Sequence, residues 1–456
     1  MILAARKKRG DGEDERAWFG KPGALILAIA SLFAVSCERC QTEPSPVCQP
    51  ECSRGFVCDE DRNICLAANL TTYEGEPGGR AARVTLVERR PFVALIQPTE
   101  SLVLIGYADE REPSFEILSQ NVRPGTSRVA VAVGGGKLSV AWIGDRGFYR
   151  IATRELTGED AGAWSIELVR AVEGDEMVPT YQSTDDFDLE IDADGRRAIV
   201  FRDRSTRALQ WLRERADVTN WTLGVIDDGL TAGVDACPES TRQEQRRGLG
   251  IEPDLVFTQD TFYVAYHDAD CGDLRLARLG PSGRWLISVL DRGSEDATPT
   301  TWTTGRFPSL AIDALGRPAV SYQDLSRGRL LFGVLDGEDF ASEVVDPGWG
   351  VARTTQRPKK IVGAFSTLGY DNDEQPFITY FDAGEANLMR ARALVVDGEG
   401  DQRVWAREVL ESRGLVGFFS HHVFSSTLGL TVVGERLLPG QNGMRSELVI
   451  VTEGSR

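Results

Sequence analysis

The sequence predicts an all-β fold, a β-propeller of seven blades, and three observations lead to this prediction. An aromatic residue followed by a short alternating strand recurs along the chain at intervals of 49 to 65 residues. Three further alternating segments precede each of these strands, so that each repeat holds four strands. The repeats lack the apolar spacing of an amphipathic helix. Radial closure of four-stranded repeats protects the strand edges that an open sheet exposes, which favours a propeller.

Composition narrows the class of protein before any motif is considered. The chain has 456 residues, of which 41% are hydrophobic and 26% are charged, and this is enough apolar material for a core. Its 51 basic residues are outnumbered by 69 acidic residues, which gives a net charge of −18. A negatively charged surface repels the phosphate backbone of nucleic acids, so we expect no nucleic-acid partner.

The N-terminal segment indicates export. An apolar run at 24–36 follows a flank rich in Lys and Arg and is too short to span a bilayer, which is typical of a signal peptide. Ala34-Val35-Ser36-Cys37 resembles the lipobox of bacterial lipoproteins, although that family prefers Leu where this chain has Ala34. The resemblance implies a signal peptide at 1–36, a lipid anchor on Cys37 and an outer-membrane or cell-surface location. The alternatives are a plain secretory signal and an uncleaved anchor. A plain secretory signal would give a periplasmic or secreted protein.

Residues 37–80 form a second unit, which we interpret as a small disulfide knot and a linker. Four cysteines lie close together in a segment too short to bury a core: Cys48, Cys52, Cys58 and Cys65. Their gaps differ from the paired spacing of zinc sites, so disulfides are the better interpretation. The segment resembles the minimal cysteine modules, loosely EGF-like, that follow the lipobox in some bacterial surface proteins. The pairing of the four cysteines stays open.

The propeller is expected over residues 81–456. Its repeat is clearest between Gly305 and Val345, where PSLAID, PAVSYQD, RLLFGVLD and FASEVV follow one another with short turns between them. The same order recurs in the copies that begin at DLEIDADG, PDLVFTQD and STLGYDND, and a shorter first copy begins at RVTLVERR. The turns DADG, DALG and DNDE supply hairpin turn chemistry. Aromatic residues open the fourth strands: Phe115, Trp164, Trp221, Trp285, Phe340 and Trp405.

The last copy lacks its fourth strand. Residues between Leu66 and Tyr73 are expected to supply this strand and so to close the ring end to end. Six blades is the alternative, because the first copy is compressed and the last is incomplete.

The repeats GRFPSLAIDALGRPAVSYQD and GAFSTLGYDNDEQPFITYFD resemble the export-targeted propeller repeats of bacterial surface proteins, which are related in shape to sialidase-like propellers. The resemblance implies the fold and covers about four fifths of the chain. The Asp-box of sialidases, Ser-x-Asp-x-Gly-x-x-Trp, is absent from the sequence. No sialidase catalytic residue can therefore be placed on this chain.

Loop lengths point to one face of the propeller. The long crossovers between blades and the turns from strand two to strand three open on the same side, here called the crossover face, whereas the short hairpin turns open on the other. Binding groups concentrate on long loops held by a rigid scaffold. The candidate ligand-binding residues in these crossovers are Tyr181, Trp302, Trp349, Arg353 and Arg357. The aromatic rings could stack on a sugar or a side chain, and the arginines could hold a carboxylate or sulfate.

Two other features belong to the same face. Cys237 and Cys271 are expected to form a disulfide, since free thiols are disfavoured in an oxidising compartment. Aspartates end the second strands of successive blades, and their repetition favours a structural role as acceptors for turn amides over a ligand site. They are Asp145, Asp203, Asp268, Asp324 and Asp382.

Motifs for catalysis are few. The sequence has no GxSxG, no phosphate loop and no HExxH, and its only histidines are His267, His421 and His422. We therefore expect no metal and no cofactor. The leading hypothesis is a non-catalytic binding or scaffold role for an envelope or extracellular glycan or a surface protein, with the membrane contacted through the lipid anchor alone. The alternative is a carbohydrate-active enzyme, a glycoside hydrolase or lyase, that uses carboxylates near the propeller channel.

Overall fold

The structure is a computed structural model that describes residues 56–453 apart from a set of internal segments. These segments are 60–63, 68–69, 78–80, 98–99, 109–112, 127, 159–161, 174–175, 178–180, 182, 217–219, 230–248, 259–260, 293–302, 349–360, 395–402 and 441–442. Several predicted sites therefore lie outside the described residues: Cys37, Cys48, Cys52, Cys237, Trp302, Trp349, Arg353 and Arg357. Within the described residues, no helix has the length and apolarity to cross a membrane.

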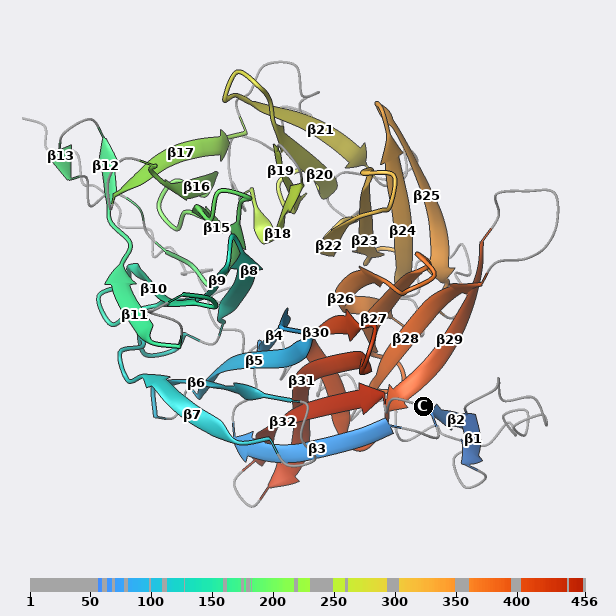
Figure 1. Ribbon diagram of the computed structural model, residues 1–456. Coiled ribbons are helices and arrows are strands. Elements are labelled where there is room, and N and C mark those ends of the chain that lie inside the picture. Colours follow the sequence, from blue (N-terminus) through green and yellow to red (C-terminus); the bar gives the residue numbers. More distant parts are fainter. Residues whose placement is uncertain are drawn as a thin grey trace, which may run out of the picture.

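Seven antiparallel sheets stand around a common axis and form a seven-bladed propeller, as the repeats predict (Figure 1). The first three blades consist of β4 (Arg83–Val87), β5 (Arg90–Gln97), β6 (Leu102–Tyr107) and β7 (Phe115–Ser119); β8 (Ala130–Gly134), β9 (Lys137–Ile143), β10 (Tyr149–Glu155) and β11 (Trp164–Leu168); and β14 (Phe187–Ile191), β15 (Arg197–Arg202), β16 (Leu209–Glu214) and β17 (Trp221–Asp227).

The next three blades have the same order. They consist of β18 (Ile251–Thr258), β19 (Thr261–Asp268), β20 (Asp273–Leu279) and β21 (Trp285–Asp291); β22 (Arg306–Ile312), β23 (Pro318–Asp324), β24 (Arg329–Asp336) and β25 (Asp339–Asp346); and β26 (Val362–Tyr370), β27 (Pro376–Asp382), β28 (Asn387–Leu394) and β29 (Val404–Glu411). The six-bladed alternative is excluded.

The seventh blade joins the two ends of the propeller. It contains β30 (Leu415–Ser425), β31 (Gly429–Gly440) and β32 (Gly443–Glu453), and its fourth strand is β3 (Leu70–Pro77). Strand β3 pairs antiparallel with β32, from Leu70 opposite Glu453 to Pro77 opposite Glu447. The predicted end-to-end closure is thereby confirmed, and the propeller includes residues that the sequence assigned to the linker before residue 81.

Short strands extend two of the blades outward. The hairpin of β1 (Phe56–Asp59) and β2 (Ile64–Ala67) joins the edge of β29 through a parallel pair, and its register makes Cys58 and Cys65 directly opposed residues. Strand β12 (Ala171–Glu173) pairs with β17 and carries β13 (Glu176–Met177). The disulfide pairing within the cysteine module stays a prediction.

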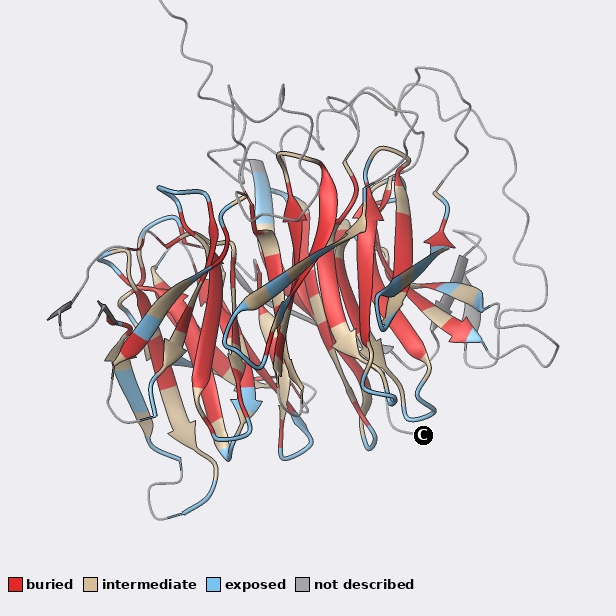
Figure 2. Cartoon of the chain, turned by 90° about the horizontal axis from the view of Figure 1, so that it is seen from above, coloured by how far each residue is buried: buried red, intermediate tan, exposed pale blue. Residues whose placement is uncertain are grey.

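The core consists of apolar layers between neighbouring blades. Every junction has its own cluster, including the junction of the seventh blade with the first, where Val433 and Ile450 pack against Val93 and Leu95. Figure 2 shows these buried residues along the strands of the blades, with exposed residues gathered at the turns. The repeated tryptophans belong to these layers: Trp164, Trp221, Trp285 and Trp405 each pack against the preceding blade.

The first strand of each blade faces the axis. These inner strands, β4, β8, β14, β18, β22, β26 and β30, each contact the next one and so form a closed ring. The ring places one face of every inner strand on a shared central space.

Candidate functional site

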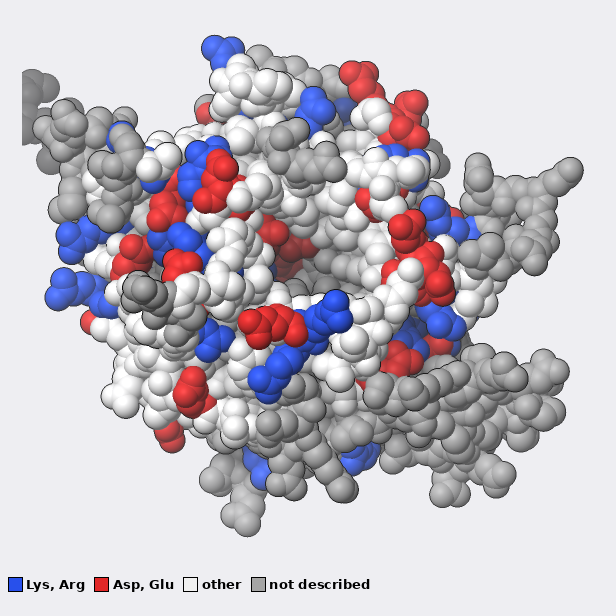
Figure 3. Space-filling view, viewed as in Figure 1, with Lys and Arg blue, Asp and Glu red and all other residues white. Residues whose placement is uncertain are grey.

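A cavity of about 510 Å³ lies on the axis, where the seven inner strands meet. A volume of this size is typical of pockets that bind small molecules. Its lining residues come from all seven inner strands or from the segments directly before them. Figure 3 shows the hollow at the centre of the ring, with acidic side chains at its wall.

Two rings of equivalent residues form most of the wall. The middle ring occupies one register position on every inner strand and consists of Arg83, Ala130, Asp188, Asp254, Ser309, Thr367 and His421. The mouth ring lies two residues earlier in each blade, nearer the crossover face, and consists of Ala81, Arg128, Asp186, Glu252, Phe307, Phe365 and Phe419. Every member except Ala130 lines the cavity.

The backbone of the mouth ring is locally strained. Five of its seven residues have a positive φ, between 49° and 54°, although none of them is glycine: Ala81, Glu252, Phe307, Phe365 and Phe419. In β18, β22, β26 and β30 the ladder shifts register at this position, which defines a β-bulge. Positive φ is rare for bulky residues, and bulges re-aim side chains next to functional sites. Here they belong to the wall of the cavity.

Hydrogen bonds between blades hold both rings in place. In the middle ring, Leu255 N donates to Asp188 Oδ2 at 2.9 Å and Leu310 N donates to Asp254 Oδ2 at 2.6 Å. Ser309 Oγ accepts in the same way from Leu368 N at 3.1 Å. Each of these side chains therefore links its own blade to the next one.

One side of the wall is acidic. Asp186, Asp188 and Glu190 lie at alternate positions of one segment and point to the same face, and Asp254 follows on the next blade. Burial and the charge of Asp188 raise the pKa of Glu190 to about 8. Burial raises the pKa of Asp254 to about 7, with further contributions from the charge of Asp188 and a hydrogen bond to it. Protons are thus held on this arc at neutral pH.

Glu252 differs from the carboxylates of this arc, because it forms both an ion pair and a backbone hydrogen bond within the protein. Arg306 forms an ion pair with Glu252 at 3.0 Å, and Phe307 N donates to Glu252 Oε2 at 2.8 Å. These contacts fix the bulge at Phe307. We therefore assign Glu252 a structural role.

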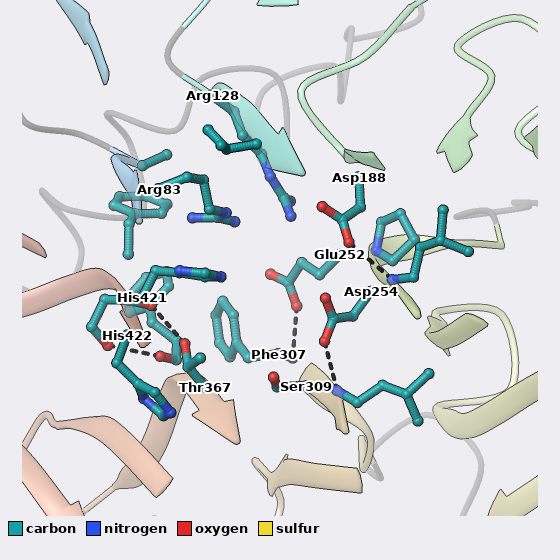
Figure 4. A pocket seen from close by; sticks show the side chains of 18 of the residues that line it. Arg83, Arg128, Asp188, Glu252, Asp254, Phe307, Ser309, Thr367, His421 and His422 are labelled. Carbon is teal, nitrogen blue, oxygen red and sulfur yellow. Dashed lines mark hydrogen bonds between the residues drawn. The ribbon is translucent and has the colours of Figure 1, made fainter. Parts of the chain in front are cut away.

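A basic arc adjoins the acidic one where β8 neighbours β14, and it continues along the wall to β4 and β30. Figure 4 shows Arg83, Arg128 and His421 pointing toward the centre across from Asp188, Glu252 and Asp254. Burial, and next the charge of Arg128, lower the pKa of Arg83 to about 9. Burial and the charge of Arg83 also hold the pKa of His421 well below its usual range, so that this imidazole is neutral. Its Nδ1 accepts a long hydrogen bond of 3.5 Å from Val84 N, which places the proton on Nε2.

Between these two arcs lies an aromatic arc. The Phe365 ring lies 4.5 Å from Phe307 and 4.5 Å from Phe419, measured between centroids. All three rings are half-buried and line the cavity. Ser366 Oγ donates to Phe307 O at 2.7 Å and Ser420 Oγ donates to Phe365 O at 2.9 Å, and these bonds hold the bulges that carry the rings.

Tyr181 does not present the exposed ring that the sequence predicts. Its side chain is 4% exposed and stacks on Tyr149, with the ring centroids 5.7 Å apart. Its hydroxyl donates to Val169 O at 3.0 Å and accepts from Tyr149 N at 3.2 Å. Burial therefore makes Tyr181 part of the junction between the second and third blades. The other four predicted ligand-binding residues stay predictions.

The aspartates that end the second strands have the predicted structural role in the turns. Asp203 Oδ1 accepts from the amides of Ser205 and Thr206, and Asp382 Oδ1 accepts from the amide of Gly384. Asp268 and Asp324 accept from the amides of their own turns in the same way. These carboxylates serve the turn and not the cavity.

Cys271 is disulfide-bonded, and Cys237 lies outside the described residues, so the pairing of these two stays a prediction. Asp268, Cys271 and Asp273 approach closely enough for a metal site. A disulfide sulfur offers no thiolate, so this cluster lacks the ligand that such a site needs.

The sequence analysis did not identify the cavity residues, although a signal was present. Asp186, Asp188 and Glu190 alternate along a strand whose other face is buried, so that all three must face one space. The equivalent segments of the fifth and sixth blades carry Ser309 and Thr367 at the middle-ring position. A comparison of equivalent positions between repeats would have marked the acidic arc as an exception to the repeat.

No protein-family model and no curated protein matches the chain. Similar solved structures include a protein of unknown function from Dyadobacter fermentans, with 10% identity, a TM-score of 0.45 and coverage of 84% of this chain and 95% of that one. A protein from Lactobacillus plantarum has 12% identity, a TM-score of 0.48 and coverage of 80% and 97%. The polysaccharide lyase Uly1 has 10% identity, a TM-score of 0.42 and coverage of 84% and 91%.

Proposed function

We propose that the central cavity binds a saccharide and transfers protons to and from it, which makes the protein a carbohydrate-active enzyme of the hydrolase or lyase class. One observation carries this proposal: carboxyl groups that hold protons at neutral pH face arginines across one cavity. Perturbed carboxyl groups that converge in a pocket are a general mark of acid–base chemistry. For this reason we favour catalysis over the purely binding role that was the leading expectation from the sequence.

In this proposal Glu190 is the general acid and Asp254, beside Asp188, is the proton acceptor. With a pKa of about 8, Glu190 is protonated at pH 7 and can donate to the oxygen of a leaving sugar. Asp254, with a pKa of about 7, is partly ionised at the same pH and can take a proton from water or from the sugar. The aromatic arc offers apolar ring faces on which a pyranose can stack.

The test is to incubate the protein with a panel of envelope and extracellular polysaccharides. New reducing ends report cleavage of either type, and absorbance of a new conjugated double bond reports elimination alone. Glu190→Gln and Asp254→Asn are expected to lower the rate by about 10²- to 10⁴-fold, the usual contribution of a general acid or base. The matched control is Asp336→Asn, which removes an exposed carboxylate with 76% side-chain exposure at the end of β24. Equal loss in the control, or no product from any polysaccharide, would refute catalysis.

A second candidate function is non-catalytic sugar binding. Asp188 and Asp254 each give one oxygen to a backbone amide of the next blade, as Ser309 does, and this is a structural task. If that task is their only one, the cavity binds without turnover. Retention on a polysaccharide column without product release would favour this function.

We also propose that the chain acts outside the cytoplasm, anchored by a lipid on Cys37, where glycans or surface proteins are within reach. The lipobox-like sequence at 34–37 supports this proposal. Cys37→Ala is expected to move the protein from the membrane fraction to the soluble fraction. Unchanged retention in membranes would contradict a lipid anchor at this residue.

A further inference from the structure

We propose that the ligand of the central cavity is an anionic saccharide, whose carboxylate or sulfate group binds between Arg83 and Arg128. This inference rests on the proposed function, because it names the substrate class of the same site. It follows from three properties of the cavity: unpaired cations, acceptors opposite to them, and an apolar arc between the two.

The two cavity arginines have no ionic partner in the part of the chain that the structure describes. Arg83 Nη1 donates to the carbonyl of its neighbour Ala82 at 3.3 Å. Arg128 Nε is buried without a hydrogen-bond partner, and the Arg128 guanidinium lies 6.0 Å from the centre of the Phe187 ring. The donors of the two arginines remain available to a bound anion.

The proximity of the two guanidinium groups favours an anion between them. The charge of Arg128 lowers the pKa of Arg83 and the charges of Asp188 and Asp254 raise it less, which means that the two neighbouring cations repel each other. A carboxylate or sulfate oxygen would relieve this repulsion and accept charge-assisted hydrogen bonds. Neutral His421 adds an Nε2–H donor on the same side.

The rest of the wall selects a saccharide among possible anions. Asp188 and Asp254 offer acceptor oxygens and protonated Glu190 offers a donor, and both kinds of group suit hydroxyl groups. The ionised carboxylates repel a second negative charge. A phosphate-rich ligand is therefore disfavoured. A sugar acid has one anionic group, several hydroxyls and an apolar ring face, which match the basic, acidic and aromatic arcs in turn.

The experiment measures binding without relying on turnover. Isothermal titration of the full chain uses galacturonate, glucuronate and galactose 6-sulfate as anionic probes, and galactose and glucose as neutral ones. The anionic probes are expected to bind, and Arg83→Met and Arg128→Met are each expected to weaken them by about tenfold or more, since hydrogen bonds to charged groups are lost. The uronates and the sulfate separate the two sources of the anionic group.

A matched control and two opposing outcomes keep the inference distinct from catalysis. Arg284→Met removes an exposed arginine in the turn between β20 and β21 and should leave binding unchanged, while thermal unfolding checks that each variant is folded.

Three results would overturn the inference: equal binding of neutral and anionic probes, no binding of the anionic probes, or anionic binding that both cavity variants retain. Anionic binding that depends on the arginines, without product from acidic polysaccharides, would support the inference and refute catalysis. Cleavage of neutral glycans alone would support catalysis and overturn the inference of an anionic ligand.

Discussion

The arginines between the blades and the arginines of the cavity have opposite surroundings. Arg275 is 2% exposed and is held between Asp227, at 2.9 Å, and Asp268. Arg390 pairs with Glu408 at 2.6 Å and with Glu453 of the next blade at 3.2 Å. Arg83 forms no ion pair within the described residues, although the charges of Asp188 and Asp254 raise its pKa. The comparison shows that the ion pairs of Arg275 and Arg390 join the scaffold together, whereas Arg83 keeps donors that face the cavity.

Two carboxylates, Glu214 of the scaffold and Glu190 of the cavity, differ in the direction of their pKa shifts. Glu214 pairs with Arg197 of its own blade, which also pairs with Glu167 of the preceding blade. Burial alone would raise the pKa of Glu214, but the hydrogen bond and charge of Arg197 outweigh burial and lower it. Burial and the charge of Asp188 both raise the pKa of Glu190 in the cavity. An ionised Glu214 therefore stabilises the fold, and an ionised Glu190 destabilises it. The fold keeps the cavity ready for a ligand at some cost in stability.

The largest expected effect separates the two kinds of arginine. Arg275→Met leaves Asp227 and Asp268 buried without their cation, and removing one partner of a buried ion pair costs about 3–5 kcal/mol of unfolding free energy. Arg83→Met is the matched cavity variant and removes a guanidinium that has no carboxylate partner. Its unfolding free energy is expected to stay within about 1 kcal/mol of the wild type, as for other substitutions that break no buried contact.

Urea denaturation at pH 7, with both variants compared to the wild type, measures this difference. Similar losses in the two variants would show that Arg83 also belongs to the scaffold. The division between the two regions would then fail.

Repetition explains which parts of the fold could be predicted from sequence. Strand alternation and the aromatic at the start of each fourth strand depend on local residue pattern, and both recur often enough to count blades. End-to-end closure could be predicted because the last copy lacked a strand, although the closing strand is 70–77 and was expected between Leu66 and Tyr73. Turn aspartates such as Asp203 were assigned a structural role for the same reason, since an aspartate recurs at or just after the end of the second strand in five of the seven blades.

The cavity could not be predicted in this way, because its chemistry departs from the repeat. The mouth position is Glu252 in one blade and Phe307 in the next, on the same bulged backbone with φ of 54° and 49°. Which side chains meet across the axis depends on the ring closure of seven blades, and no local pattern encodes it. Tyr181 was misjudged for a related reason: it follows a crossover, yet it packs into a junction between blades.

The second expected effect is a difference in pH dependence between Glu190→Gln and Glu214→Gln. A raised pKa means that the folded state holds the Glu190 proton longer than the unfolded state does, so stability falls as pH rises from about 4.5 to about 8. Glu190→Gln removes this decline, which has a maximal slope of about 1.4 kcal/mol per pH unit. The lowered pKa of Glu214 has the opposite sign: its stabilisation is present above pH 4.5 and is lost as pH falls further. Melting temperatures from pH 3 to pH 9 should show Glu190→Gln gaining stability relative to the wild type as pH rises above about 4.5, with the full difference reached near pH 8. Glu214→Gln should be less stable than the wild type at neutral pH, with the deficit shrinking in acid. Parallel curves for the two variants would mean that the cavity carboxyl is as well paired as the one between the blades.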